Sequence, residues 1–247
     1  MTSELRSRTS SGFLSASVLR VLAMTCMLLD HMWATVVPGN FWMTCAGRLA
    51  FPLYAFQLAE GFFHTADRRR YALRLLGLAL VSEVPFDLVQ FSTLFFPFHQ
   101  NTVFTLLLGL WAISGLDRAR RERTPRRIAL GLLTLAAACL LGGIGFVDYG
   151  VMGVLTVVLF YLLRDFPLAW LAQLAAMVLL NIVFFKGQTI PLLGFDFPIQ
   201  GFAVLALVPI WLYNGRRGGG GKTLQTAFYA FYPVHMLVLY LLFSLLR

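Results

Sequence analysis

Several ionisable side chains of this sequence stand inside long apolar stretches. Asp30 and His31 interrupt one such stretch, and Arg48 interrupts the next. Inside a bilayer an ionisable group is costly unless it is paired or hydrated, so it marks a functional site by default. A histidine beside a hydrated cavity can take a proton from a nucleophile near neutral pH. We therefore predict a membrane-embedded site with His31 as general base, and Asp30 as a further catalytic candidate.

The composition shows which elements must position these residues. The chain has 247 residues, of which 59% are hydrophobic and only 13% charged. Soluble domains average about 45–50% apolar and about 25% charged residues, and one domain of this length cannot bury such an excess. Disordered chains are poor in apolar residues, so disorder is excluded too. The sequence predicts an all-α, polytopic integral membrane bundle, because lipid offers the backbone no partner outside its own helix.

Nine apolar stretches are candidate transmembrane helices. The stretch 150–164 is short for a crossing of about 20 residues and follows a tight break, so eight spans or a pair of half-helices are alternatives. We interpret residues 1–17 as a flexible cytoplasmic tail and residues 18–247 as a single transmembrane helical domain. The nine stretches are 18–37, 41–63, 71–91, 101–116, 127–146, 150–164, 168–185, 199–214 and 226–246.

The basic residues predict the orientation of the chain. Of the 20 Lys and Arg, all but Arg48, Lys186 and Arg247 lie in the tail or at the same side of the predicted bundle. The positive-inside rule then places the N-terminus in the cytoplasm and, with nine spans, the C-terminus outside. The positive-inside rule accounts for the net charge of +9, so this charge does not indicate a nucleic-acid partner and we expect none. The three cysteines all lie within apolar stretches, which argues against a metal cluster.

In this orientation polar residues from several spans converge in the outer half of the bundle. Glu83 and Asp87 share one helix face, with Pro85 between them as an expected kink. His235 is a second catalytic candidate, and either it or Asn101 is a candidate donor to an oxyanion. We predict that the acceptor site or its polar layer contains Arg48, Glu83, Asp87, His99, Gln100 and Asn101.

Each of these residues also has a purely structural interpretation. Neighbouring helical residues diverge by about 100°, so Asp30 is poorly placed to bond His31 and can instead pair with Arg48 to hold two helices together. Glu83 and Asp87 can also form ion pairs with Arg48, or bind the ammonium group of an acceptor. His99 can cap its helix. These alternatives remain open at this point.

The inner ends of the first two spans carry a second set of charges. Arg20 precedes His31 by eleven residues, which is about three helical turns, so both lie on one face about 16 Å apart. Such a pair suits a substrate that threads the membrane from the cytoplasm, although Arg20 can also be a plain positive-inside anchor. Glu60 is expected to face Arg20 or the arginines 68–74 as a gate or a structural pair.

The segment from Arg20 to His31 is similar to the opening helix of membrane-bound acyltransferases, a superfamily that carries an arginine, ten residues and a histidine. More specifically, the chain resembles the TraX family, the proposed N-acetylases of conjugative pilin. The resemblance covers residues 1–110 and the last helix, whereas residues 127–214 match only in hydropathy. It rests on MLLDH (27–31), GRLAFPLYAFQLAEGFFHT (47–65), SEVPFD (82–87), HQNTVFTLLLG (99–109) and FYPVH (231–235).

The resemblance implies acetyl transfer from cytoplasmic acetyl-CoA, the donor substrate, to an acceptor at the outer face of the bacterial inner membrane. By analogy His31 is the base and Arg20 helps to seat the donor. The acceptor is an amine or hydroxyl of a pilin-like peptide, a sugar or a lipid, and no metal is expected. Because arginine forks match phosphate, the candidates for binding the donor's phosphates are Arg20, Arg68, Arg69, Arg70, Arg74, Arg216 and Arg217.

Two other functions are compatible with the sequence. A proton-coupled or small-solute transporter also needs buried charges, and His31, Glu83 and Asp87 could form its relay. Transporters commonly show paired halves, which this sequence lacks. If the protein is instead a non-catalytic membrane assembly factor, we expect all residues of the polar layer to form salt bridges with one another and to leave no cavity.

Overall fold

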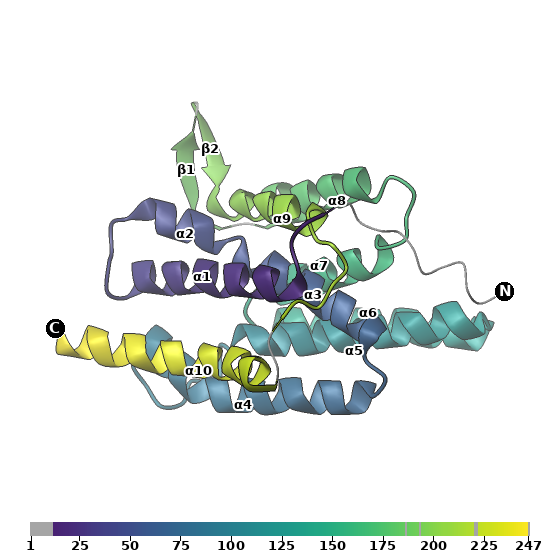
Figure 1. Cartoon of the computed structure of the whole chain (residues 1–247), viewed down its shortest axis with the longest axis horizontal. Helices are drawn as coiled ribbons and strands as arrows, with labels where there is room; N and C mark the ends of the chain where they lie inside the picture. The colour runs from purple at the N-terminus through teal and green to yellow at the C-terminus, as the bar shows by residue number, and fades with distance from the viewer. Residues whose placement is uncertain (1–11, 186, 193, 220–221, 247) are drawn as a thin grey trace.

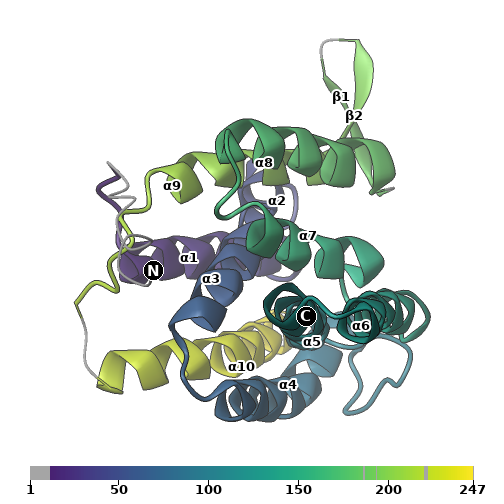
Figure 2. The same cartoon turned by 90° about the vertical axis from the view of Figure 1, so that its right-hand side faces the viewer.

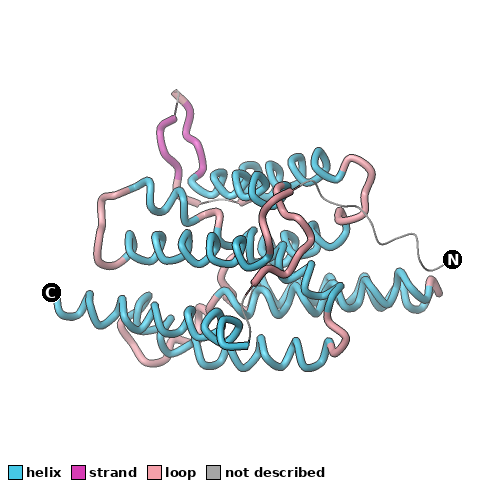
Figure 3. Tube along the Cα trace, in the orientation of Figure 1, coloured by secondary structure: helices cyan, strands magenta, loops and turns pink. Residues whose placement is uncertain are grey.

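The helices of this protein run side by side along one long axis (Figures 1 and 2). The computed structural model describes residues 12–185, 187–192, 194–219 and 222–246. In this part of the chain one short antiparallel hairpin interrupts an otherwise helical fold, as the tube in Figure 3 shows. Residues 1–11 of the predicted tail lie outside the described residues. The rest of the predicted tail is ordered, since the backbone N–H of Leu14 donates to the Leu212 carbonyl (2.9 Å) and α1 begins at Ala16.

The elements follow one another back and forth along this axis. They are α1 (Ala16–Ala34), α2 (Phe41–Gly47), α3 (Ala50–His64), α4 (Arg68–Phe91), α5 (Thr102–Glu122), α6 (Pro125–Ile144), α7 (Gly150–Leu162), α8 (Ala169–Val178) with a π-helical continuation (Leu179–Phe184), β1 (Thr189–Leu192), β2 (Phe195–Pro198), a 3₁₀ helix (Ile199–Ala206) leading into α9 (Leu207–Trp211), and α10 (Lys222–Leu245).

Four helices are long and apolar enough to cross a membrane: 16–34, 102–122, 125–144 and 224–245. Large apolar side chains also cover the outer surface, for example Leu132 and Leu133 on α6. A soluble protein does not expose so much contiguous apolar surface. The chain is therefore an all-α membrane protein, while the count of nine spans and the orientation remain predictions.

Local capping sets several helix ends that hydropathy alone misplaces. The Asp67 side chain accepts a hydrogen bond from the backbone N–H of Arg70 (2.9 Å), so α4 begins at Arg68 rather than at residue 71. The helix predicted to end at residue 116 continues to Glu122 through a charged last turn. Hydropathy reports only the part of a helix suited to lipid, whereas the backbone stays helical beyond it.

Three predicted spans differ in detail from single regular helices. The predicted span 41–63 is divided into α2 and α3, with Arg48 at the break between them. The predicted spans 168–185 and 199–214 contain π-helical and 3₁₀ segments respectively, and the hairpin joins them. The helix α4 continues through Pro85, so the expected kink at this residue, which stays a prediction, does not divide the helix.

The view along the helices shows how the bundle is layered (Figure 2). The 3₁₀–α9 segment and α8 lie at the top, α1, α2, α3 and α7 in the middle, and α4, α5, α6 and α10 below. The core fills the space between the middle and lower layers, where Leu53, Phe62, Ile113 and Tyr161 are fully buried or nearly so. The α1 and α10 helices, which carry the two candidate catalytic histidines, come from different layers and meet at the side of this core.

Candidate active site within the bundle

The two histidines in the predicted spans form a direct pair between α1 and α10. His31 Nδ1 lies 2.8 Å from His235 Nε2, and the rings are stacked with centroids 5.0 Å apart. His235 Nδ1 in turn lies 2.8 Å from the carbonyl oxygen of Phe231. The residues are 204 positions apart in sequence, so only the tertiary fold brings them together.

This geometry determines which nitrogens carry protons in the neutral pair. A carbonyl oxygen can only accept, so His235 donates through Nδ1 and keeps a lone pair on Nε2. His31 then donates from Nδ1 to that lone pair. The remaining nitrogen, His31 Nε2, is left unprotonated, which is the form that a general base requires.

The predicted pair between Asp30 and Arg48 is present and links α1 to the α2–α3 break. Arg48 donates to one carboxylate oxygen of Asp30, and the buried Thr44 hydroxyl donates to the other (2.7 Å). Gly47 permits this close approach, because a Cβ at that position would come within 2.4 Å of the Asp30 Cβ. Asp30 is thereby held beside His31 without bonding to it.

A cavity of about 220 Å³, the outer cavity, opens beside these residues. His31 and the Asp30–Arg48 pair contribute to its wall, and so does Asp148 from the connection before α7. Much of the remaining wall is aromatic, formed by Trp33, Phe51, Phe86, Tyr149 and Phe185. A nucleophile bound here would meet both the base and a carboxylate.

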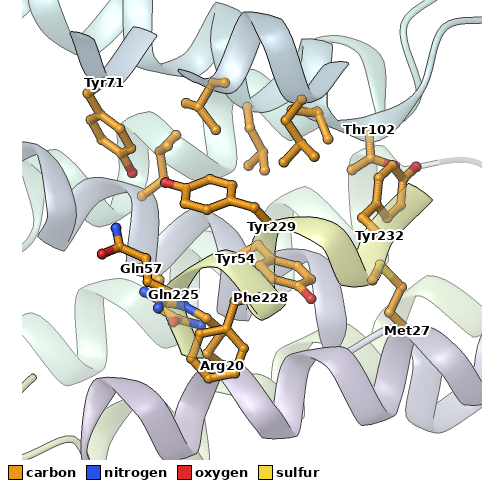
Figure 4. Close-up of a pocket in the computed structure, with 15 residues that line it drawn as sticks. Arg20, Met27, Tyr54, Gln57, Tyr71, Thr102, Gln225, Phe228, Tyr229 and Tyr232 are labelled. Carbon is orange, nitrogen blue, oxygen red and sulfur yellow. The ribbon is translucent and has the colours of Figure 1, made fainter. Parts of the chain in front are cut away.

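Two further cavities adjoin the outer cavity along the bundle. The middle cavity has a volume of about 160 Å³ and shares Met27, Tyr54 and Thr102 with the outer cavity. Figure 4 shows Met27, Thr102 and Tyr232 at one end of it, Arg20, Gln57 and Gln225 at the other, and Tyr54 and Tyr229 between. The inner cavity, about 510 Å³, shares the second group and extends to the start of α1.

Three arginines that form no ion pair within the described part of the chain line the inner cavity. Among the described residues Arg20 makes no salt bridge, and its guanidinium lies 4.9 Å above the ring of Phe228. Arg217 donates a hydrogen bond to Gln225 (3.1 Å), and Arg74 stands at the edge of the cavity. These three arginines give the inner cavity an excess of positive charge.

Other predicted donor-binding residues lie elsewhere. Arg68 pairs with Asp117 (2.6 Å) and Arg70 with Asp67 (3.0 Å), while Arg69 and Arg216 do not line the three cavities. Glu60 lines the inner cavity together with Arg20 and Arg74, as expected, but among the described residues it forms no salt bridge with either of them. Glu60 bonds Arg164 instead (2.6 Å), because the end of α7 packs against α3 at this level.

The remaining polar residues of the predicted layer form a separate cluster around the start of α5. Asn101 caps α5 through its Oδ1, and its Nδ2 donates to the Ala79 carbonyl (2.8 Å) and to Glu83. Asp87 accepts from the backbone N–H of Phe96 (2.8 Å). The Asn101 side chain is fully buried, so it is not a free donor at the outer cavity, and neither carboxylate answers Arg48.

His99 and Gln100 fasten the loop that follows α4. His99 Nε2 lies 3.8 Å from Asp148 Oδ1, and the His99 ring stacks on Phe86. The neighbouring Asp148 carboxylate raises the pKa of His99. Gln100 bonds the backbone of Pro97 (2.6 Å). Asn101, rather than His99, provides the helix cap. Asp148 joins this loop to the wall of the outer cavity.

Three cavity residues were missed by sequence reasoning. Asp148 lies in a connection outside the predicted spans, and Tyr54 and Gln57 lie inside an apolar stretch. Tyr54 and Gln57 are three residues apart and therefore lie on one helix face. A search for polar positions at this spacing within the predicted span 41–63 would have found them.

The fold and the site define a helical membrane protein with an intramembrane polar cavity. The family model for the TraX protein matches residues 15–243, so the chain belongs to the TraX family, as the sequence resemblance predicted. It is 31% identical over 240 residues to "Probable fimbrial assembly protein FimC, serogroup H1" of Dichelobacter nodosus, covering 91% of this chain and 94% of that protein. It is 27% identical over 168 residues to "Protein TraX" of Escherichia coli, covering 65% of this chain and 63% of that protein. No solved structure gives a significant match.

Proposed function

We propose that this protein is a membrane acyltransferase that moves an acetyl group from cytoplasmic acetyl-CoA to an amine or hydroxyl at the outer face of the bacterial inner membrane. One observation carries the proposal: a series of three cavities, each sharing lining residues with the next, extends from Arg20 to His31. Arg20 makes no salt bridge among the described residues, and the Nε2 of His31 is unprotonated in the neutral histidine pair. A base at one end and a cation at the other suit a long substrate with its phosphates at one end and its reactive carbonyl at the other.

The donor would lie along the three cavities. Arg20 and Arg217 would bind the phosphates of CoA in the inner cavity, since guanidinium groups form paired hydrogen bonds with phosphate. The pantetheine arm would cross the middle cavity. Arg20 and His31 are about 16 Å apart along α1, a separation comparable to the extended arm.

Gln57 supports this placement of the arm. Its Nε2 donates to the Leu53 carbonyl (3.2 Å), and its Oε1 is buried with no hydrogen-bond partner among the described residues. A buried acceptor without a donor costs about 1–3 kcal/mol. An amide N–H of the pantetheine arm would satisfy this oxygen at the junction of the inner and middle cavities.

The chemistry then takes place where the middle and outer cavities join. The acceptor nitrogen or oxygen attacks the thioester carbonyl while His31 Nε2 removes its proton. The C–S bond breaks as the tetrahedral intermediate collapses, and the proton on His31 passes to the leaving CoA sulfur. The products are the acetylated acceptor and CoA, and His31 returns to its starting form.

Two groups would assist this step. His235 holds the proton of His31 on Nδ1, so that Nε2 remains the basic nitrogen. Tyr54 lines both the middle and the outer cavity, and its hydroxyl can donate to the oxyanion. We propose Tyr54 as the oxyanion donor instead of Asn101, because the Asn101 amide donates to the Ala79 carbonyl and to Glu83.

The relatives suggest the biological setting. One is named for fimbrial assembly, so we propose that this protein acts in the assembly of a surface filament. The acceptor would then be a pilin-like peptide amine, or a sugar or lipid group that takes part in assembly. Its acetylation would take place in the outer cavity, beside Asp148 and the aromatic wall.

Binding of CoA fragments tests the proposal without knowledge of the acceptor. Calorimetry would measure CoA, adenosine 3′,5′-bisphosphate and pantetheine against the detergent-purified protein. We expect Arg20→Ala to weaken CoA and the bisphosphate about tenfold, and Gln57→Leu to weaken CoA and pantetheine about tenfold, each losing one charge-assisted or buried hydrogen bond.

Arg126→Gln is the matched control, because this exposed arginine lies at the inner end of α6 and lines none of the three cavities. It should bind all three compounds like the wild type. Absence of CoA binding by folded wild-type protein would overturn the proposal. In that case, uptake of a solute into proteoliposomes would favour the transporter.

A non-catalytic role in assembly is a second candidate function, favoured by the Asp30–Arg48 ion pair, which consumes two of the polar residues. It predicts that His31→Gln supports filament assembly as well as the wild type does. The acyltransferase predicts that assembly, or the modification that it depends on, is lost in this variant.

A further inference from the structure

A groove of about 250 Å³ opens on the outer surface of the bundle between α4 and α10. These helices lie side by side at the edge of the molecule in both views (Figures 1 and 2). The groove is separate from the proposed catalytic centre and almost entirely apolar. It is lined by Arg74, Gly77, Leu78, Val81, Tyr229 and Pro233.

Two features keep the groove open toward the bilayer. A Cβ added to Gly77 would have no atom within 4 Å, so this glycine leaves open space along α4. Val81, one turn further along, has 65% of its surface exposed. From Arg74 to Val81 the groove follows α4 for about 10 Å. Its shape and polarity therefore suit a hydrocarbon chain lying along the helix.

The inner end of the groove carries a cation. Arg74 is exposed, makes no ion pair among the described residues, and lies 6.0 Å from the Tyr71 ring centroid. It stands six residues after the start of α4, or about 9 Å along the helix. In the predicted orientation this depth lets a long arginine side chain reach the headgroup region of the cytoplasmic leaflet.

We propose that this groove binds a phospholipid of the cytoplasmic leaflet. Its phosphate would pair with the Arg74 guanidinium, which matches phosphate geometry, and one acyl chain would lie over Gly77 toward Pro233. Both parts of the ligand are needed, because the cation and the apolar groove are continuous. The proposal concerns lipid binding and does not depend on acyl transfer.

Tyr229 links the lipid groove to the cavities inside the bundle. This residue lines the groove and also the inner and middle cavities. It is therefore part of the wall between the bilayer and the proposed donor path. A lipid chain in the groove would pack on the outer side of this wall.

Native mass spectrometry of delipidated protein tests the site with three probes. Phosphatidylglycerol carries both phosphate and chains, diacylglycerol carries only chains, and glycerol 3-phosphate carries only the phosphate. We expect retention of phosphatidylglycerol alone. Arg74→Gln and Gly77→Leu should each lower its occupancy about tenfold, the first by removing a charged hydrogen-bond donor and the second by filling the groove.

Two control variants make comparable changes at exposed positions of α6. Arg126→Gln removes an exposed arginine at the inner end of α6, and Ala129→Leu enlarges an exposed residue of that helix. Both should retain phosphatidylglycerol like the wild type. Equal retention by Gly77→Leu and Ala129→Leu, with native unfolding temperatures, would overturn the site. Equal retention of diacylglycerol would overturn the role of Arg74 and its phosphate, and retention of glycerol 3-phosphate alone would overturn the lipid as ligand.

Discussion

Two clusters of polar side chains lie toward the same end of the bundle, and they differ in what surrounds them. The first, the histidine cluster, contains Asp30, His31, Arg48 and His235 and faces the outer cavity. The second, the loop cluster, contains Glu83, Asp87, His99 and Asn101 and fastens the loop between α4 and α5. Both contain aspartate and histidine, and both lie within or beside apolar stretches.

The difference teaches what a buried polar group does in a membrane protein. In the loop cluster Glu83 accepts from Asn101, and one oxygen of Asp87 accepts from the backbone N–H of Phe96. The other Asp87 oxygen has no hydrogen-bond partner among the described residues, but Asp87 lines none of the three cavities, so a substrate there would not meet it. In the histidine cluster His31 Nε2 remains unprotonated in the neutral pair, and His31 lines the outer cavity. Burying polar groups is costly in both clusters, so this cost does not distinguish them. Only a group that can still form a hydrogen bond and that a substrate can reach can act on that substrate.

The strongest test of this comparison removes the base. His31→Ala should lower the rate of CoA release from acetyl-CoA by about 10³-fold, because general base catalysis contributes about 10²–10⁴. Glu83→Gln should keep the rate within about threefold, since its partner Asn101 can still donate to the amide oxygen. Thiol release measured on purified protein checks both variants. A loss in Glu83→Gln equal to that in His31→Ala, at an unchanged unfolding temperature, would remove the distinction.

A second test asks whether His235 acts through His31. His235→Ala should lower kcat by about 10²-fold with little change in KM, because His31 loses the acceptor that holds its proton on Nδ1. His235→Gln restores an acceptor oxygen and should recover most of this loss. The pH profile of kcat distinguishes positioning from packing. If both variants lose activity in proportion to lost stability, His235 is only a structural residue.

The third test is directed at the loop cluster. Asn101→Ala removes the cap of α5 and the donor to Glu83, so it should lower the stability of the fold by about 1–2 kcal/mol. The catalytic rate of the folded fraction should be unchanged. Thermal unfolding and thiol release at a temperature well below the transition measure the two effects separately. A fall in rate without a fall in stability would place Asn101 in the site after all.

The smallest expected effect concerns pH. The neighbouring Asp148 carboxylate raises the pKa of His99, so the folded state binds this proton more tightly than the unfolded state does. The resulting stability is fully present below the ordinary pKa of histidine, and it is lost as the pH rises through the raised value. Because His99 is partly exposed, we expect less than about 1 kcal/mol. His99→Gln should abolish this dependence when unfolding temperatures are compared between about pH 5 and pH 8.

Part of the fold and site could be predicted because the lipid bilayer allows few backbone structures. Apolar stretches must be helical in lipid, so the helices were found, although caps such as Asp67 moved their ends by a few residues. The pairing of Asp30 with Arg48 was also foreseeable, since the two charges lie at similar depth on consecutive spans. The pairing of Glu60 with Arg164 was not, because it joins α3 to α7 across 104 residues.

The sequence by itself determined that this is a helical membrane protein of the TraX family, and that polar residues gather toward one end of its helices. These properties follow from composition and local order, because the bilayer accepts few backbone structures and few charges. The tertiary structure alone decided that His235 bonds His31 and that the Gln57 side-chain oxygen between two cavities has no hydrogen-bond partner among the described residues. It also decided that the Asn101 amide is already bonded within the protein. Hydrogen-bonding capacity depends on neighbours brought in from distant helices, and packing alone sets those neighbours.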